Sequence, residues 1–238
     1  MRVLSFSETG YVRENNEDGF IVLSDYGVYA VADGMGGHSA GEVASDMAIK
    51  EIENHVKELP GISGEELSTW LTKVMTAGNQ TVFEYSQSLP EKEMGTTLTI
   101  LLLRDDLAII AHVGDSRAYL WRENKLACLT IDHSLPGELV RYGKISPEEA
   151  ANHPLRHRLL RALGPFEEIN PEYYTVDVKE GDVFLLCTDG VTNMVSDEEL
   201  AANFGSQGEW EEKMDNLKAL ILERGAKDNF TALCCILD

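Results

Sequence analysis

The sequence predicts an α+β fold: a central β-sandwich of two antiparallel sheets flanked by helix pairs, in a four-layer αββα arrangement. Strand-like and helix-like stretches occur in separate blocks rather than in alternation, which is typical of antiparallel sheets. Several strand-like runs are apolar on both faces, so each sheet needs cover on both sides. No repeat, low-complexity tract or linker interrupts the 238 residues, and we expect one domain over residues 1–238.

The N-terminal third predicts three strands followed by two long helices. Residues 2–8, 20–23 and 28–33 have the strand pattern, and a polar loop at 13–18 has no apolar residue to bury. From about 38 to 57 the apolar residues recur at helical spacing until Pro60-Gly61. A second amphipathic helix is expected from about 65 to 88.

The rest of the chain predicts mainly strands, closed by two short helices and a last strand. Residues 94–130 predict a meander, with one strand over 95–103 and the next ending at Asp115. The stretch 132–164 is the most basic part of the chain and has short helical pieces. Strands are expected at 173–178 and 183–187, helices near 196–204 and 209–224, and a final strand from 230.

The amino-acid composition limits the kinds of partner and the compartment that we expect for this chain. With 41 acidic and 20 basic residues the net charge is −21, which opposes binding to nucleic acid or to an anionic membrane. No apolar run reaches the roughly 20 residues that span a bilayer, and the start lacks a signal-peptide layout. All four cysteines lie in apolar runs without Cys-x-x-Cys spacing, so we expect reduced core residues. We therefore expect a cytoplasmic protein that acts as a monomer.

Acidic residues recur where predicted strands meet turns. They stand in Asp33-Gly34, Asp115-Ser116, Asp189-Gly190 and Asp228-Asn229. A buried strand cannot hide an unpaired carboxylate cheaply, so each acid is either a turn former or a ligand. If these strands share one end of a sheet, the carboxylates repel each other unless a cation lies between them. Oxygen ligands of this kind suit Mg²⁺ or Mn²⁺.

Cations held by carboxylates can carry out phosphate-ester hydrolysis. Two of them polarise a phosphoryl oxygen and activate a water near neutral pH. Arg13 is a candidate phosphate clamp, because a guanidinium matches the paired oxygens of phosphate with two hydrogen bonds. The alternative is a solvated arginine in a polar loop.

Eight motifs, in this order and spacing, resemble one known family. They are Arg13-Glu14-Asn15-Asn16-Glu17-Asp18, Ala32-Asp33-Gly34-Met35-Gly36-Gly37-His38, Gly95-Thr96-Thr97, Gly114-Asp115-Ser116-Arg117-Ala118-Tyr119, Asp132-His133-Ser134, Arg161-Ala162-Leu163-Gly164, Thr188-Asp189-Gly190 and Asp228-Asn229. The chain resembles the type 2C metal-dependent protein serine/threonine phosphatases in their compact bacterial form, over essentially its whole length. The fold of that family is a β-sandwich flanked by helix pairs, which agrees with the expectation above.

The resemblance implies a pair of Mn²⁺ or Mg²⁺ ions. Asp33 is expected to bridge them, the Gly34 carbonyl to bind the second, and Asp189 with Asp228 to complete the first. The reaction it implies is hydrolysis of phosphoserine and phosphothreonine on cytoplasmic proteins, by a hydroxide that bridges the two ions. The substrates would be products of a serine/threonine kinase.

Further roles follow from the same resemblance. Asp18, with Glu17, would act through metal-bound water, and Asp115 with Asp189 would hold a third, weaker ion. Arg13 would hold the substrate phosphate, with Arg117 or Arg161 next in line.

The identity of the general acid is left open by the motifs. Eukaryotic relatives place a histidine after the Asp-Gly pair, where this chain has Met35. His38 is the nearest candidate, and metal-bound water is the alternative. Bacterial relatives often carry asparagine where His157 stands.

Two other segments are assigned by the motifs. Residues 135–156 match a variable flap beside the site, and we interpret the nearby His133, His153 and His157 as flap contacts or surface residues rather than ligands. The glycines at 36, 37 and 41 could cradle phosphate at a helix start. We favour the view that they let the chain turn away from a crowded site, because no nucleotide-loop lysine follows.

Two alternative functions remain beside the phosphatase. One is a phosphoprotein-binding module of the same fold without turnover, which the intact Asp33, Asp189 and Asp228 oppose. The other is a metal-dependent hydrolase of small phosphate esters.

Overall fold

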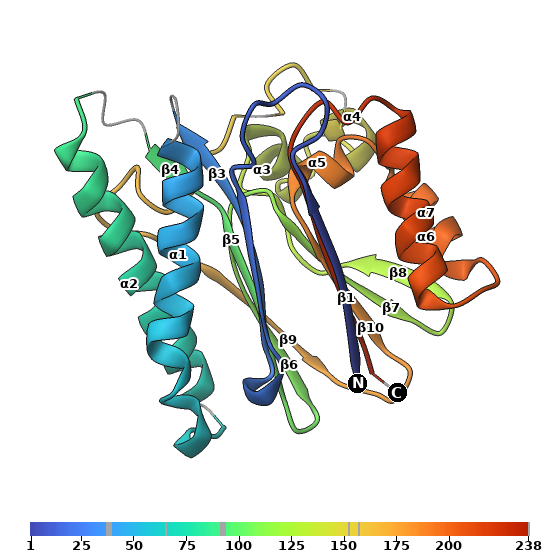
Figure 1. The fold of residues 1–238 in the computed structure, drawn as a ribbon, viewed down its shortest axis with the longest axis horizontal. Helices are drawn as coiled ribbons and strands as arrows, with labels where there is room; N and C mark the ends of the chain where they lie inside the picture. Colours follow the sequence, from blue (N-terminus) through green and yellow to red (C-terminus); the bar gives the residue numbers. More distant parts are fainter. Residues whose placement is uncertain (37–39, 65, 91–93, 152, 157, 238) are drawn as a thin grey trace.

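The computed structural model is described here for residues 1–36, 40–64, 66–90, 94–151, 153–156 and 158–237 (Figure 1). It contains two antiparallel sheets. The first sheet has the order β1 (Arg2–Glu8), β11 (Phe230–Ile236), β10 (Val183–Cys187), β7 (Arg117–Arg122), β8 (Lys125–Cys128). The second has the order β2 (Asp18–Leu23), β3 (Val28–Gly36), β5 (Leu98–Arg104), β6 (Leu107–Val113), β9 (Glu172–Asp177), and β4 (Met94–Thr96) pairs with the end of β3.

Helix pairs cover the outer faces of the sandwich (Figure 1). The pair α1 (Ala40–Val56) and α2 (Glu66–Ser88) packs on the second sheet. The pair α6 (Asp197–Gly205) and α7 (Trp210–Glu223) packs on the first. Shorter helical turns are η1 (Ser24–Tyr26), η2 (Leu59–Gly61), α3 (Leu135–Arg141), α4 (Pro147–Ala151) and α5 (Asp189–Thr192). The predicted four-layer αββα fold is confirmed.

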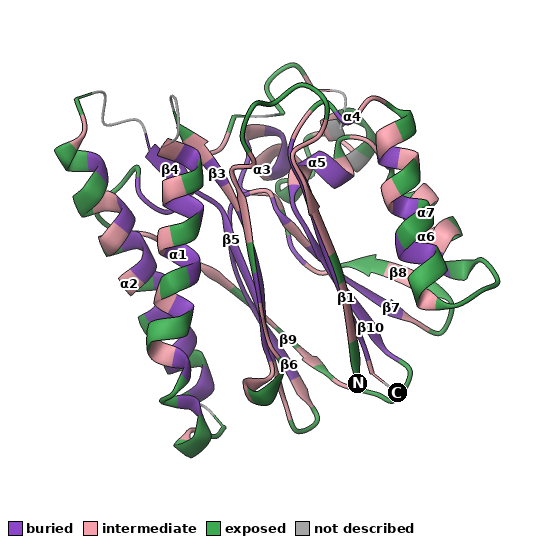
Figure 2. Ribbon diagram, viewed as in Figure 1, coloured by how far each residue is buried: buried purple, intermediate pink, exposed green. Residues whose placement is uncertain are grey.

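Three apolar layers hold the sandwich together. The layer between the sheets contains Tyr29, Leu101, Phe184 and Leu233, each no more than 1% exposed. Figure 2 shows buried residues along the strands of both sheets and on the sides of the helices that face them. This explains why the strands are apolar on both faces: one face meets the other sheet, and the other meets a helix pair.

One predicted strand continues further than expected, and another is divided. The strand that begins at Val28 does not end at Asp33 but continues to Gly36, because its last residues pair with β4. The single strand expected over 95–103 is divided into β4 and β5, since Thr97 lies between them and is bonded to Asp33 instead. Asp33 therefore lies inside a strand that changes partner, and not in a terminal turn.

The cysteines are free, as predicted, but one of them is not in the core. Cys187, Cys234 and Cys235 are buried, whereas Cys128 is exposed on β8. The expectation of a buried Cys128 was wrong because β8 is an edge strand with little covering it. Over the described part of the chain, no helix combines the length and apolar character that crossing a bilayer requires.

Candidate active site

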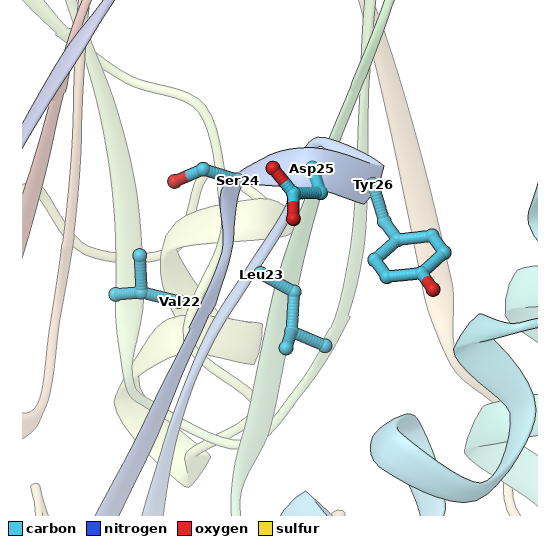
Figure 3. Close-up of a pocket in the computed structure, with 5 residues that line it drawn as sticks. All are labelled: Val22, Leu23, Ser24, Asp25 and Tyr26. Atoms are coloured by element: carbon cyan, nitrogen blue, oxygen red, sulfur yellow. The ribbon is translucent and has the colours of Figure 1, made fainter.

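Asp18 and Asp33 lie directly opposite each other on β2 and β3. They stand at the open end of this hairpin, the upper end of the molecule in Figure 1, where α5 also begins. The other end of the hairpin, at Leu23 and Val28, carries η1 and a surface hollow of about 220 Å³. Figure 3 shows that Asp25 is the one carboxylate among the five residues that line this hollow. None of the predicted site residues lies there.

The carboxylate of Asp18 joins the two sheets. Its Oδ2 accepts hydrogen bonds from Thr188 Oγ1 at 2.8 Å and from Thr231 Oγ1 at 2.7 Å. Both threonines belong to the first sheet: Thr231 lies on β11, and Thr188 lies between β10 and α5. Asp18 Oδ1 is buried and has no hydrogen-bond partner among the described residues. Sequence reasoning gave Thr188 no role although it stands in a quoted motif, and it missed Thr231, whose hydroxyl in the otherwise apolar last strand was a signal.

Hydrogen bonds to its backbone groups hold Asp33 in place. Its N–H donates to Thr97 Oγ1 at 2.8 Å, and its carbonyl accepts from the Thr97 N–H at 2.8 Å and from Thr96 Oγ1 at 3.0 Å. The threonines of the Gly95-Thr96-Thr97 motif therefore fix the backbone of Asp33 without neutralising its carboxylate.

Asp189 and Asp228 come from turns that pack against each other. Asp189 is the first residue of α5, and Asp228 comes shortly before β11. A Cβ at Gly190 would lie 1.9 Å from the Asn229 carbonyl oxygen, so glycine is required for this approach. Asp115 follows Gly114 after the end of β6. The first sheet thus supplies two of the five aspartates and the second sheet supplies three.

The site has an excess of negative charge. Burial, opposed by the threonine hydroxyls and reinforced by Asp189 and Asp228, raises the pKa of Asp18 to about 7. Burial and the charges of Asp18, Asp189 and Asp115 raise the pKa of Asp33 well above its usual value. Burial and the charge of Asp189 do the same to the pKa of Asp115. Each of these carboxylates is therefore short of a positive neighbour.

The donor set fits divalent cations that prefer oxygen. The unpartnered oxygen of Asp18 is one available ligand. A Cβ at Gly41 would lie 2.8 Å from the Gly34 carbonyl oxygen and 2.9 Å from Glu17 Oε1, so these two oxygens converge where glycine leaves room. Carboxylates and carbonyls are the ligands of Mg²⁺ and Mn²⁺. The close crossing at Gly34 and Gly41 supports our view that the glycines allow the chain to turn.

The full ligand set stays a prediction. Within the described residues, no three Asp, Glu, His or Cys side chains converge closely enough to hold one ion by themselves. Mg²⁺ usually keeps several waters, so carbonyl oxygen and water would complete its coordination.

Arg13 contacts one of the predicted metal ligands. Its Nε lies 2.8 Å from Asp228 Oδ1, and its Nη2 donates to Asp228 Oδ2 at 2.9 Å. Asn229 holds the loop that carries Arg13: its Nδ2 donates to the carbonyls of Thr9 and Asn15, and its Oδ1 accepts from the Glu17 N–H. The Asp228-Asn229 motif therefore positions the arginine as well as a carboxylate.

The other two arginines considered for the phosphate are engaged elsewhere. Arg117 donates two hydrogen bonds to Asp132, and Arg161 contacts Glu138 and Glu172. Their side chains are 26% and 29% exposed, against 49% for Arg13. Arg13 is thus the most accessible of the three.

The histidine predictions have mixed outcomes. His38 and His157 lie outside the described residues. Met35 pairs with Gly95 across β3 and β4. His133 is fully buried and bonded to Gly114, so the alternative that made it a surface residue was wrong. A basic stretch of sequence gave no sign that this histidine packs under the site.

Open space lies beside Asp18. A pocket of about 360 Å³ lies between the start of β2 and α1. It is lined by Asn16, Asp18, Gly19, Phe20, Glu42, Val43, Ser45, Asp46 and Ile49. Of the five site aspartates, Asp18 is the one that lines this pocket.

Comparison with known proteins gives one consistent result. The family model described as protein phosphatase 2C matches residues 12–222. The chain belongs to the protein phosphatase 2C family. A serine/threonine phosphatase stp from Listeria monocytogenes is 40% identical over 232 residues, which are 95% of this chain and 92% of that protein.

Solved structures of family members agree over the whole fold. The serine/threonine phosphatase PstP/Ppp of Mycobacterium tuberculosis is 37% identical with a TM-score of 0.90, and the match covers 100% of this chain and 98% of that one. A PstP catalytic domain in complex with two manganese ions is 34% identical with a TM-score of 0.86, with the same coverage. The protein is thus a metal-dependent protein serine/threonine phosphatase that uses Mn²⁺ or Mg²⁺ and acts on phosphoproteins.

The raised pKa of Asp18 predicts a pH-dependent stability in the metal-free protein. The folded state keeps Asp18 protonated up to about pH 7, whereas the unfolded chain loses this proton near its ordinary pKa. Stability from this group is therefore present at low pH and lost as pH rises toward 7. We expect Asp18→Asn to raise the free energy of unfolding at pH 8 by about 1 to 3 kcal/mol, and by less at pH 5.

Urea unfolding in excess chelator at both pH values measures this difference. Asp25→Asn is the matched control, since Asp25 is an exposed carboxylate at the other end of the same hairpin. Equal effects of the two variants at both pH values would contradict the prediction.

Proposed function

We propose that the carboxylate end of the sandwich is the phosphatase active site, and that it acts on phosphoserine and phosphothreonine of proteins modified by a serine/threonine kinase. The observation that carries this is the meeting of repelling carboxylates from both sheets around Asp18 and Asp33. Like charges in such a place raise the free energy of the fold, so their presence calls for a bound cation.

The ions are assigned to the residues as follows. Asp33, the Gly34 carbonyl, Asp189 and Asp228 would hold a pair of Mn²⁺ or Mg²⁺ ions, with Asp33 shared between the two. When bound, the ions supply Lewis-acid chemistry: they polarise the phosphoryl oxygens and lower the pKa of water at the site. Thr188 and Thr231 hold Asp18 in place while leaving its Oδ1 unpartnered, and the Thr97 contacts fix Asp33. Asp18, and with it Glu17, would orient water beside these ions.

Arg13 is the proposed phosphate clamp. Its Nε and Nη2 face Asp228, which anchors the guanidinium. A guanidinium has five N–H donors in a planar fork, so the Nη1 side remains for the phosphoryl oxygens of the substrate. Asp228 thereby orients Arg13 as well as serving as a ligand.

Asp115 is proposed to hold a third, weaker ion together with Asp189. Met35 has no proton to give, so the leaving serine or threonine oxygen needs another donor, either His38 or water at the Asp115 side of the site.

The remaining proposals concern the protein as a whole. We propose a single domain over residues 1–238, with a flap at about 135–156 that includes α3 and α4; both helices lie at the site end of the molecule (Figure 1). We propose a cytoplasmic monomer, which the three buried free cysteines support because a reducing compartment keeps thiols free. The net charge of −21 supports the absence of nucleic-acid and membrane partners.

Chelation tests the proposed chemistry directly. Phosphate release from phosphoserine and phosphothreonine peptides should stop in excess chelator and return with Mn²⁺ or Mg²⁺, while Zn²⁺ should restore it poorly because the ligands are oxygens. Full turnover in chelator would rule out the mechanism. Metal binding without turnover would favour the binding module, and turnover of small esters alone would favour the third alternative.

Arg13→Ala should raise KM for phosphopeptides by about tenfold or more, because it removes charge-assisted hydrogen bonds to the phosphate. Calorimetry should find Mn²⁺ binding retained. The KM of Arg13→Lys should lie between those of the wild type and Arg13→Ala, because lysine keeps the positive charge but cannot donate two parallel hydrogen bonds. Arg2→Ala is the control, because Arg2 is an exposed, ion-paired arginine at the far end of β1. An unchanged KM in Arg13→Ala would show that a residue other than Arg13 binds the phosphate.

Asp115→Ala should separate two substrates. We expect the fold and the paired ions to persist, because Asp33, Asp189 and Asp228 remain. Turnover should fall much more on phosphopeptides, with poor leaving groups, than on p-nitrophenyl phosphate, whose leaving group needs little protonation. Equal losses on both substrates would contradict a role in protonating the leaving group. No loss on either would mean that Asp115 serves only as a turn former.

A further inference from the structure

The turn that carries Asp115 lies beyond the pairing of β6, and on its far side Ser116 is hydrogen-bonded to Thr97 and Thr99. The pairing of β6 with β5 ends at Val113, and Gly114 follows outside the ladder. Gly114 has a φ of 116°, and a Cβ there would lie 2.5 Å from Thr97 side-chain carbons. The turn is therefore packed tightly on one side, and the direction in which Asp115 leaves it depends on two anchors: the contacts of Ser116 after it and whatever holds the Gly114 peptide groups before it.

His133 holds both polar groups of Gly114. The Gly114 N–H donates to His133 Nδ1 at 3.2 Å, and the Gly114 carbonyl accepts from the His133 N–H at 2.7 Å. Because Nδ1 accepts, a neutral ring carries its proton on Nε2. Only the first of these contacts is made by the ring, which is fully buried; the second is made by the His133 backbone.

The other ring nitrogen faces the base of the flap. His133 Nε2 lies 3.4 Å from Glu172 Oε1, an ion-pair contact, and has no hydrogen-bond partner among the described residues. Glu172 is itself fixed: Arg141 donates to both of its oxygens, at 2.6 Å and 3.0 Å, and the Tyr174 hydroxyl donates to Oε2 at 2.5 Å. Arg141 is the last residue of α3. An unbroken series of contacts thus runs from the flap helix to the turn before Asp115.

Packing alone is the competing explanation for His133. Its ring lies 4.7 Å from that of His112, which is also fully buried and bonded to Thr99. A ring that only fills space between His112 and the β6 turn would tolerate any side chain of similar volume. A ring that holds Gly114 requires an acceptor at the Nδ1 position.

We propose that His133 is a positioning residue for the phosphatase reaction: it fixes the Gly114 peptide groups and hence the direction of Asp115, and Glu172 orients its ring from the flap side. This rests on the role proposed above for Asp115. A carboxylate displaced by about 1 Å costs a large part of an enzyme's rate, although the displaced residue is intact.

Substituting His133 by asparagine or by glutamine distinguishes a positioning role from a packing role, because the two side-chain amides differ in length. In His133→Asn the side-chain oxygen takes the place of Nδ1 and keeps the acceptor for Gly114. In His133→Gln the amide reaches the place of Nε2, keeps a donor for Glu172 and loses the acceptor. Both variants replace the ring by a polar side chain, so they share any loss of stacking on His112.

The first measurement is hydrogen exchange of the Gly114 amide in the metal-free protein, followed by NMR. We expect exchange to rise about tenfold or more in His133→Gln, corresponding to one lost hydrogen bond, and to change much less in His133→Asn. Urea unfolding of both variants confirms that each is folded before the comparison. Equal exchange in the two variants would overturn the proposal.

The second measurement is turnover. His133→Gln should lower kcat on phosphopeptides by about tenfold with less effect on p-nitrophenyl phosphate, the same preference as expected for Asp115→Ala, while His133→Asn stays closer to the wild type. Normal turnover in His133→Gln overturns the proposal. If Asp115→Ala also has normal turnover, the proposed role of Asp115 has failed; if Asp115→Ala is impaired, the failure belongs to His133 alone.

The flap side is tested by Arg141→Gln and Glu172→Gln. Glu172→Gln keeps an acceptor for His133 and should have little effect on Gly114 exchange, whereas Glu172→Ala should raise it. Arg141→Gln removes one clamp from Glu172 without touching His133 and should have an intermediate effect. Identical exchange in Glu172→Ala and the wild type would overturn the part assigned to Glu172.

Discussion

The hydrogen bonds that Asp18 accepts from Thr188 and Thr231 connect the two sheets at the site end. They bring the carboxylates of β2 and β3 close to those that precede and follow the strands of the first sheet. Since the apolar layer between the sheets fixes how the sheets pack, the carboxylates cannot move apart without losing that layer. The core therefore enforces the repulsion at Asp33 and Asp115, and a cation relieves it.

Carboxylates in this molecule accept hydrogen bonds from one of two kinds of donor, arginine side chains or neutral hydroxyl groups. Asp182, away from the site, and Asp132, whose charge acts on Asp115, each receive two hydrogen bonds from an arginine, which neutralises their charge. At the site, Asp18 receives only hydroxyl groups, which fix its position but leave its charge unopposed. Neutral donors thus hold a ligand ready without competing with a cation for it. Asp228 is the exception at the site, because it accepts a hydrogen bond from an arginine. That arginine is Arg13, the proposed phosphate clamp.

Sequence reasoning succeeded where local pattern carries the information and failed where a residue's environment comes from elsewhere. Periodicity located both helix pairs and most strands. It ended the strand at Asp33 too early, because the partner of residues 34–36 is β4, far along the chain. It placed Cys128 in the core because an apolar run does not say whether a strand is at an edge. It allowed His133 to be a surface residue, because a histidine in a polar, basic stretch beside a variable flap gives no sign of burial.

The sequence by itself determined the fold class and the order of the acidic motifs along the chain, since strand period, turn chemistry and motif spacing are local properties. Only the tertiary structure showed what holds those residues. Thr231 and Asp18 are 213 positions apart, and Arg13 and Asp228 are 215 apart. Such contacts depend on how the two sheets stack and on the register of their strands, and no stretch of sequence encodes either one locally.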